Sequence, residues 1–277
     1  MLSDNSTIMN VQIRSFDQIK QVVKFFSQQL KFDKFIKKTG RKLANTIEDI
    51  ITLSLFKQKH NIETKKSLYD IFKDKLNCTY KTLVVNMNRW VHLAVIILIL
   101  ILKRNRKNQH LVKHIDSTDL PVCLFKNAHY HKTMKNFSAF DHSAKGIYFG
   151  LRLHLISDLK RKVLAIRFTS ANVDDREVVF ELTDEIAGIL IADAGYIKKE
   201  LQQAYYQEGK RIMLVQPRKN MKKLMTKLEE KLLQTRMLIE LNFRSLKMFY
   251  GLITSLPRSV DGYLANYIYS LLAYQII

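Results

Sequence analysis

The sequence predicts an α/β domain with a mixed sheet flanked by helices, preceded by an N-terminal all-α domain. Two observations lead to this fold class. Early in the chain, apolar residues recur at helical spacing, as Phe16, Ile19 and Val23 do. From residue 106 onward, segments with strand-like apolar patterns alternate with helix-like segments. We therefore expect two domains, one over residues 1–105 and one over 106–277.

The first domain is expected to consist of helices. Gly40 is expected to close the first long helix, because glycine is favoured just after a helix end. The longest apolar run, LAVIILILIL at residues 93–102, is only half of the roughly 20 residues that a membrane-spanning helix needs. We expect that run to be a buried helix or strand, and the protein not to associate with a membrane.

Residues 67–90 of the first domain resemble a helix-turn-helix. Two short helices, at 67–75 and 79–89, flank a turn. The second helix would present Lys81 and Arg89 to DNA, as the recognition helix of such a motif does. A helical hairpin that binds nothing has the same pattern, so both interpretations stay open.

The second domain opens with a strand and a hairpin and continues with strand-helix units, which together predict a mixed sheet. Pro217 ends the last strand, because proline cannot donate to a sheet ladder. The expected elements, in order, are strands at 111–117, 147–157 and 162–169, a helix at 174–186, a strand at 188–194, a helix at 198–207, a strand at 211–216 and long helices from 222 onward.

Charge and cysteine content limit the function classes. The chain has 277 residues, with 46 Lys and Arg against 25 Asp and Glu, and a formal net charge of +21. A globular protein this basic repels itself unless it binds a polyanion. Nucleic acid is the leading ligand, and an anionic membrane surface is the second. The two cysteines, Cys78 and Cys123, cannot form a disulfide framework and fit a reducing cytoplasm.

Acidic residues end two of the expected strands. Asp116 ends the first strand, and Asp193 ends the apolar strand ILIADA. Ligands of open α/β sheets bind beyond the carboxyl ends of strands, and carboxylates suit hard divalent cations. Glu240 is the best third carboxylate, on a helix face that it shares with Arg236 and Lys247. The ordinary alternatives are caps or turns for the aspartates and a solvated charge for the glutamate. Acids that compete for these roles are Asp119, Glu229 and Glu230.

The chain resembles a known family over about residues 112–275. Six blocks occur in the family's order: IDSTDLPVC, YFGLRLHLI, IADAGYIKKELQ, PRKNMKK, RMLIELNFRSLK and DGYLANYIYSLLAYQ. They are similar to blocks of the DDE-class transposases of bacterial insertion sequences, specifically the insertion-sequence family numbered 982. One branch of these enzymes has a tyrosine where this chain has Leu233, and the resemblance is looser over FKNAHYHKTMKNFSAFDHSAKG.

The resemblance implies a ribonuclease-H-like fold in which Asp116, Asp193 and Glu240 form the catalytic triad and hold two Mg²⁺ ions, for which Mn²⁺ can substitute. It implies strand cleavage at the ends of an insertion sequence, followed by transfer of the freed 3′-hydroxyl into target DNA. The partners would be double-stranded DNA, at transposon ends and target, and at least a second copy of the chain. The protein would act in the bacterial cytoplasm, associated with the nucleoid.

Basic residues are expected to contact the DNA backbone, which requires only well-positioned cations. Arg236 and Lys247 would lie near the scissile phosphate, although either could equally form an intrahelical pair with Glu240. The loop PRKNMKK follows a strand near the active edge and could instead be simply solvated. Its cations are Arg218, Lys219, Lys222 and Lys223.

Two other functions stay open from the sequence. A ribonuclease-H-like nuclease would use the same triad without strand transfer. A catalytically inactive transposase remnant would bind DNA and cleave nothing. A metal-dependent cleavage assay separates the remnant from an enzyme, and a strand-transfer assay separates the nuclease from a transposase.

Overall fold

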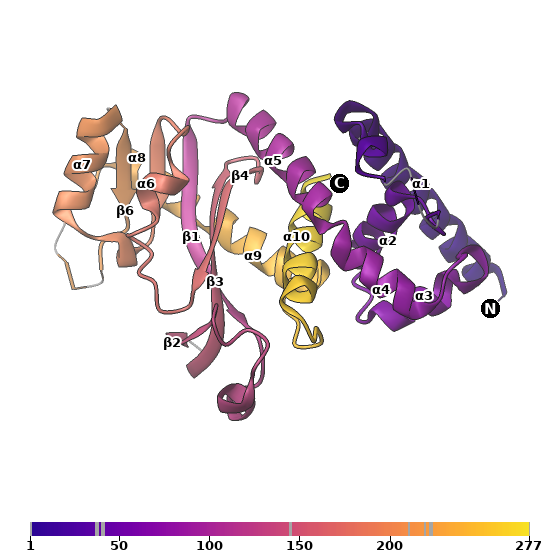
Figure 1. Ribbon diagram of the computed structural model, residues 1–277. Coiled ribbons are helices and arrows are strands. Elements are labelled where there is room, and N and C mark those ends of the chain that lie inside the picture. The colour runs from indigo at the N-terminus through magenta and orange to yellow at the C-terminus, as the bar shows by residue number, and fades with distance from the viewer. Residues whose placement is uncertain are drawn as a thin grey trace. The chain divides into compact units, whose positions relative to one another are not determined.

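The computed structural model describes residues 2–36, 39, 42–143, 146–209, 211–218, 220–221 and 224–276. The chain divides into two compact units, whose elements are labelled in Figure 1. The first unit comprises Met1–Ile99 with two C-terminal segments, Leu246–Leu252 and Leu256–Ile277. The second unit comprises Leu100–Ser245 with Ile253–Ser255.

The described part of the first unit is built from helices. Its α-helices are α1 (Leu2–Leu30), α2 (Ile47–Lys59), α3 (Lys65–Phe72), α4 (Tyr80–Arg89), the first part of α5 (Val91–Lys107) and α10 (Val260–Ile276), and its 3₁₀ turns are η1 (Phe32–Phe35) and η2 (Lys73–Lys75). Helices α2, α3 and α4 each begin after a threonine whose hydroxyl accepts a backbone N–H of the first turn. The two short helices expected around residue 77 are therefore confirmed, and their binding to DNA stays a prediction.

The C-terminal helix α10 completes the core of the first unit by packing against α2 and α4. Gln58 Nε2 donates to the backbone carbonyl of Asn266 at 3.0 Å, and the Tyr269 hydroxyl donates to the carbonyl of Met87 at 3.0 Å. Segments from opposite ends of the sequence thus share one core. The assignment of DNA binding to residues 1–105 stays a prediction.

The helical patterns of the N-terminal region are confirmed. Helix α1 buries Ile19 and Val23 and ends at Leu30, whereas Gly40 lies outside the described residues. The apolar run 93–102 is helical and lies within α5. In the described part of the chain, no single helix is long and apolar enough to cross a membrane. Only α4 and α5 taken together, bent by 41°, reach that length and composition.

A mixed sheet forms the centre of the second unit, as the sequence predicts. Its strands, among the described residues, are β1 (Val112–Pro121), β2 (Ala139–Ser143), β3 (Gly146–Asp158), β4 (Val163–Ser170), β5 (Ile189–Ala192) and β6 (Ile212–Val215). Strand β1 pairs antiparallel with β3 and parallel with β5, and β6 continues the parallel part. Strands β2 and β4 both pair antiparallel with β3.

Helices cover both faces of this sheet. They are α6 (Val179–Leu182), α7 (Lys199–Gly209), α8 (Lys227–Gln234) and most of α9 (Met237–Phe249), with 3₁₀ turns η3 (Phe125–Tyr130) and η4 (Ala194–Tyr196). One buried cluster joins Leu190 of β5 to α6 and α7, and a second joins the next residue, Ile191, to Leu233 of α8. Successive residues of a strand face opposite sides, so adjacent residues of β5 serve the two clusters.

Two details of the expected fold are wrong. The helix expected over 174–186 reduces to the short α6, because the two aspartates at its start have other partners. Asp174 accepts the backbone N–H of Arg176 at 2.9 Å, and Asp175 accepts a bond from Arg152 Nη1 at 3.1 Å. The first strand does not end near residue 117 but runs on to Pro121, so Asp116 lies in its middle. Strand β2 was not expected from the sequence.

The pairing of β1 with β3 depends on a glycine. A Cβ atom at Gly150 would collide with the backbone carbonyl oxygen of Leu120 on β1. We predict that Gly150→Ala lowers the free energy of unfolding by about 1–3 kcal/mol, because the two strands must move apart. Gly195→Ala is the matched control, since an added Cβ there meets nothing within 4 Å. Urea denaturation measures both variants, and equal losses would contradict this account of the β1–β3 contact.

Candidate active site

The parallel pairing of β1 and β5 brings two aspartates, Asp116 and Asp193, to adjacent positions on neighbouring strands. Val112 pairs with Ile189 and His114 with Ile191. Continuing this register by two residues brings Asp116 level with Asp193, which follows β5 directly. Neighbouring strands lie about 4.8 Å apart, so side chains at level positions on one face are close neighbours.

Glu240 approaches the same point from the first turn of α9. Arg236, just before that helix, carries the guanidinium that links all three acids. Its Nη2 lies 2.5 Å from Glu240 Oε1. Its Nη1 lies 3.4 Å from Asp116 Oδ2 and 4.0 Å from Asp193 Oδ1. Three acids that are distant in sequence therefore converge on one cation, and we call these four residues the carboxylate cluster.

A hydrogen bond from the sheet fixes the turn that carries Arg236. His114 Nε2, two residues before Asp116 and on the same face of β1, lies 2.8 Å from Thr235 Oγ1. The Thr235 hydroxyl itself donates to the Leu232 carbonyl at 2.6 Å, so the imidazole N–H is the donor to threonine. Burial lowers the pKa of His114 to about 4, which keeps the ring neutral.

Arg161 fixes the following turns of α9. It lies in the turn between β3 and β4 with a positive φ of 63°. Its Nε donates to Asn242 Oδ1 at 2.8 Å, and its Nη2 donates to the Leu241 carbonyl at 3.1 Å and to Ser245 Oγ at 2.9 Å. The sequence predicts the turn, but it gives no sign that this arginine reaches a distant helix. Arg161 therefore positions the helix that carries Glu240.

Burial raises the pKa of Asp116 to about 7. The backbone N–H of Ser117 and the guanidinium of Arg236 favour the charged form, whereas Asp193 and Asp175 disfavour it. The side chain of Asp116 is 19% exposed, and those of Asp193 and Glu240 are 47% and 54% exposed. The cluster thus has one partly buried acid, Asp116, and two acids that are about half exposed to solvent.

The donor chemistry of the cluster fits a hard divalent cation. All three acids offer carboxylate oxygens, the ligands that Mg²⁺ prefers, and they already surround a positive group. Across the residues that the structure describes, no three His, Cys, Asp or Glu side chains are spaced as ligands of one metal ion. A metal ion bound to these acids would need the space that the Arg236 guanidinium occupies.

The acids that compete with the cluster in sequence lie elsewhere. Asp119 is three residues from Asp116 on β1 and so faces the other side of the sheet. Glu229 forms a capping box with Thr226 at the start of α8. Of the glutamates weighed from the sequence, Glu240 is the one paired with Arg236.

A second group of polar side chains lies on the face of the sheet opposite to Asp116. Arg152 on β3 pairs with Asp175, at 3.1 Å between Nη1 and Oδ1, and with Asp141. His154 Nδ1 lies 3.3 Å from the same oxygen of Asp175. A hollow of about 190 Å³ beside this group is lined by Ser117, Thr118, Asp119, His142, Ser143, Tyr148, Arg152 and Asp175. The sequence alone does not predict this group, although it places two basic residues, in RLH, at alternate positions of one strand, where they share a face.

The residues predicted to contact DNA fall at several places. Arg218 is exposed in the loop after β6, and Lys247 lies on α9, seven residues after Glu240. Lys81 and Arg89 are exposed on α4. The other predicted cations of the PRKNMKK loop lie outside the described residues: Lys219, Lys222 and Lys223. Contact of all these side chains with DNA stays a prediction.

Comparison with known proteins identifies the family. Residues 106–259, more than half of the chain, match the family described as a transposase DDE domain. The chain therefore belongs to the DDE transposase family, as the resemblance led us to expect. Membership supports a transposase function, implies DNA as the substrate and indicates a DNA-cleaving enzyme of a class that generally uses divalent metal ions. Neither the curated proteins nor the solved structures give a significant match.

Arg236 should contribute to stability as the counter-ion of the cluster. We predict that Arg236→Gln lowers the free energy of unfolding by about 1–3 kcal/mol, because three carboxylates lose their charged partner. Added Mg²⁺ or Mn²⁺ should raise the thermal midpoint of this variant more than that of the unmodified protein.

The control for this prediction is Arg244→Gln, which removes an exposed arginine from the same helix. Thermal unfolding with and without divalent metal measures both variants. An equal loss of stability in the two variants, with no difference in their response to metal, would contradict the role given to Arg236.

Proposed function

We propose that this protein is the transposase of a bacterial insertion sequence of the family numbered 982, with a ribonuclease-H-like catalytic domain. The sheet order β4-β3-β1-β5-β6 supports that fold, since the first three strands run antiparallel and the last three parallel. The six sequence blocks that resemble this family, from IDSTDLPVC to DGYLANYIYSLLAYQ, support the narrower assignment. The proposed reaction is metal-dependent cleavage of a DNA strand at the element's ends, followed by strand transfer into target DNA.

One observation carries this proposal. Three carboxylates from β1, from the end of β5 and from α9 converge on a single cation position. An ion pair that only stabilises the fold needs one acid for one arginine. Three acids around one cation leave an excess of negative charge and of oxygen ligands, which a divalent cation could balance. We assign Asp116, Asp193 and Glu240 as the catalytic residues.

The same three acids would hold Mg²⁺, with Mn²⁺ as a substitute. Two such ions would activate an attacking oxygen and stabilise the leaving one during phosphodiester cleavage. The protein's own part is to hold the acids in position through His114 and Arg161 and to supply cations for the phosphates. With metal on the three acids, Arg236 would contact the phosphate beside the scissile bond, and Lys247 would assist.

DNA is the proposed partner in two forms, the transposon ends and the target. Arg218 and the neighbouring lysines of its loop would follow the backbone, and the helix pair α3–α4 would recognise the ends through Lys81 and Arg89. Two ends must be brought together, so we propose a dimer or larger assembly on DNA. The site of action would be the bacterial cytoplasm, on the nucleoid.

A nuclease without strand transfer would use the same cluster, and an inactive remnant would keep it without activity. These alternatives give different products from a labelled transposon end and a supercoiled target. The remnant yields no cut strand, the nuclease yields cut ends alone, and the transposase yields ends joined to the target.

The central test removes one carboxylate without changing its size. We predict that Asp193→Asn and Glu240→Gln each reduce Mg²⁺-dependent strand cleavage to background, because each removes a charged oxygen from the metal ligands. Binding to the uncleaved end should remain within about twofold, since most affinity comes from phosphate contacts elsewhere. Gel assays of cleavage and binding on one labelled end measure both.

Glu230→Gln serves as the control, since it neutralises an exposed glutamate of α8 outside the cluster. It should cleave like the unmodified protein. Full cleavage by both Asp193→Asn and Glu240→Gln would overturn the catalytic assignment.

A further inference from the structure

The segment between β1 and β3 carries aromatic side chains that its own fold does not bury. This aromatic projection, residues 124–143, contains η3 and β2, and Figure 1 shows β2 and the adjoining part of β3 extending past the end of β1. Phe125 is 51% exposed, Tyr130 83% and Phe140 41%. Soluble proteins seldom leave several large rings exposed together without a use for them.

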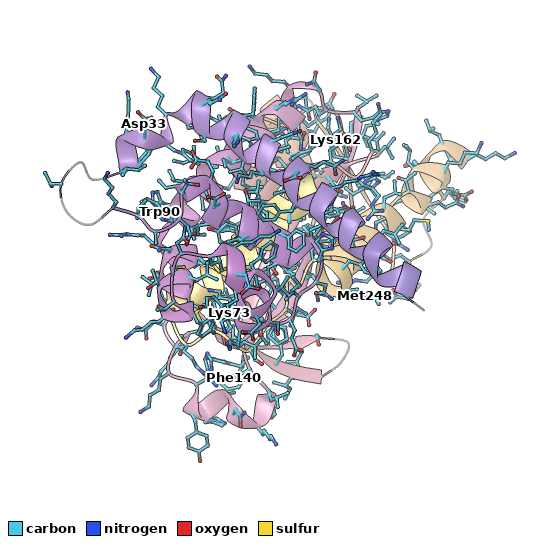
Figure 2. All side chains as sticks on the ribbon, turned by 90° about the vertical axis from the view of Figure 1, so that its right-hand side faces the viewer. Asp33, Lys73, Trp90, Phe140, Lys162 and Met248 are labelled. Carbon is cyan, nitrogen blue, oxygen red and sulfur yellow. The ribbon has the colours of Figure 1, made fainter. Side chains whose placement is uncertain are left out.

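Two of the exposed rings, Phe125 and Phe140, are held in place by contacts with other rings. Phe140, labelled in Figure 2, packs on the buried Phe149 with ring centroids 4.9 Å apart. Phe125 and His129 of η3 approach Phe140 at 6.1 Å and 5.6 Å between centroids. Ala128 and Met134 are buried below. Phe125 and Phe140 are therefore fixed by folded surroundings while they stay exposed, and Tyr130 at the end of η3 is the most exposed ring of the projection.

The charge of the projection selects the kind of ligand. Its lysines, Lys126, Lys132 and Lys135, are all exposed. Its single acid, Asp141, is engaged by Arg152 of β3. Rings interleaved with unopposed cations suit a ligand that carries both flat faces and phosphates. In duplex DNA the base faces are stacked on one another, so only unpaired bases can stack on protein rings.

The position of the projection relates it to the carboxylate cluster. Strand β1 continues from Asp116 to Pro121 toward the same end of the sheet at which β5 ends in Asp193. Five residues of strand span about 17 Å. The base of the projection therefore lies within the length of a few nucleotides of the cluster.

We propose that the aromatic projection binds unpaired bases of single-stranded DNA adjacent to the cleavage position, by stacking on Phe125, Tyr130 and Phe140 with the lysines on the phosphates. The inference rests on the proposed function in taking DNA as the ligand. It adds that the enzyme distinguishes an unpaired strand from a duplex and does so outside the carboxylate cluster.

The test measures binding of a labelled single-stranded oligonucleotide and of a duplex by fluorescence anisotropy, with the full chain and with EDTA to prevent cleavage. Tyr130→Ala and Phe140→Ala should each weaken single-strand binding on the order of tenfold, the effect of losing one base stack. Duplex binding should change by less than about twofold, because phosphate contacts dominate it. Phe140→Trp should restore single-strand binding, since it keeps a ring.

The control is Tyr206→Ala, which removes an equally solvent-facing ring (57% exposed) from α7 of the same unit. Circular dichroism checks that Phe140→Ala remains folded. Tyr130→Ala tests the proposal at a side chain that is 83% exposed, so its removal should not disturb the fold. Unchanged single-strand affinity in both alanine variants overturns the proposal. The proposal is also overturned if the alanine variants lose self-association, or binding to anionic lipid vesicles, while their affinity for single-stranded DNA is unchanged. If the protein binds duplex DNA but no single-stranded DNA, only the role given to the aromatic projection is refuted. If it binds no DNA at all, the proposed function is refuted as well.

Discussion

The pairing of three carboxylates with the guanidinium of Arg236 is the interaction on which the second unit's functional geometry depends. Burial is the largest cause of the raised pKa of Asp116, which is about 7, and repulsion from the neighbouring charge of Asp193 adds to it. The guanidinium offsets that repulsion and keeps the acids within 4.0 Å of its nitrogens. Carboxylate oxygens are also the ligands that hard divalent cations prefer, and this chemistry supports our proposal that the cluster binds metal.

Strand pairing and two side-chain contacts of the second unit hold that arrangement. Parallel pairing of β1 with β5 fixes two of the acids at one level. The third depends on α9, which is attached to the sheet by His114 at its start and by Arg161 further along. Neither contact involves a carboxylate of the cluster. Both use buried polar groups whose loss would let the helix shift, and a shift of about 1 Å is enough to spoil catalytic geometry.

Much of this could be predicted from the sequence because the signals are local. Period-two and continuous apolar patterns locate β3 and β5, and the position of Asp193 after ILIA follows directly. The helix expected over 174–186 failed because Asp175 is bound by Arg152 from another strand, a tertiary contact that no local pattern encodes. The sequence also does not predict that Arg236 contacts all three acids. Its spacing to Glu240 predicts one ion pair, but the two others require β1 and β5 to be assembled first.

The central claim is that segments distant in sequence meet at one divalent-cation site. Fe²⁺ substituted at such a site, in the presence of ascorbate and peroxide, cuts the nearby protein backbone. We predict three cuts, near residues 116, 193 and 240, and we expect excess Mg²⁺ to suppress all three together. Cuts at only one of these segments, or cuts that Mg²⁺ does not suppress, would contradict it.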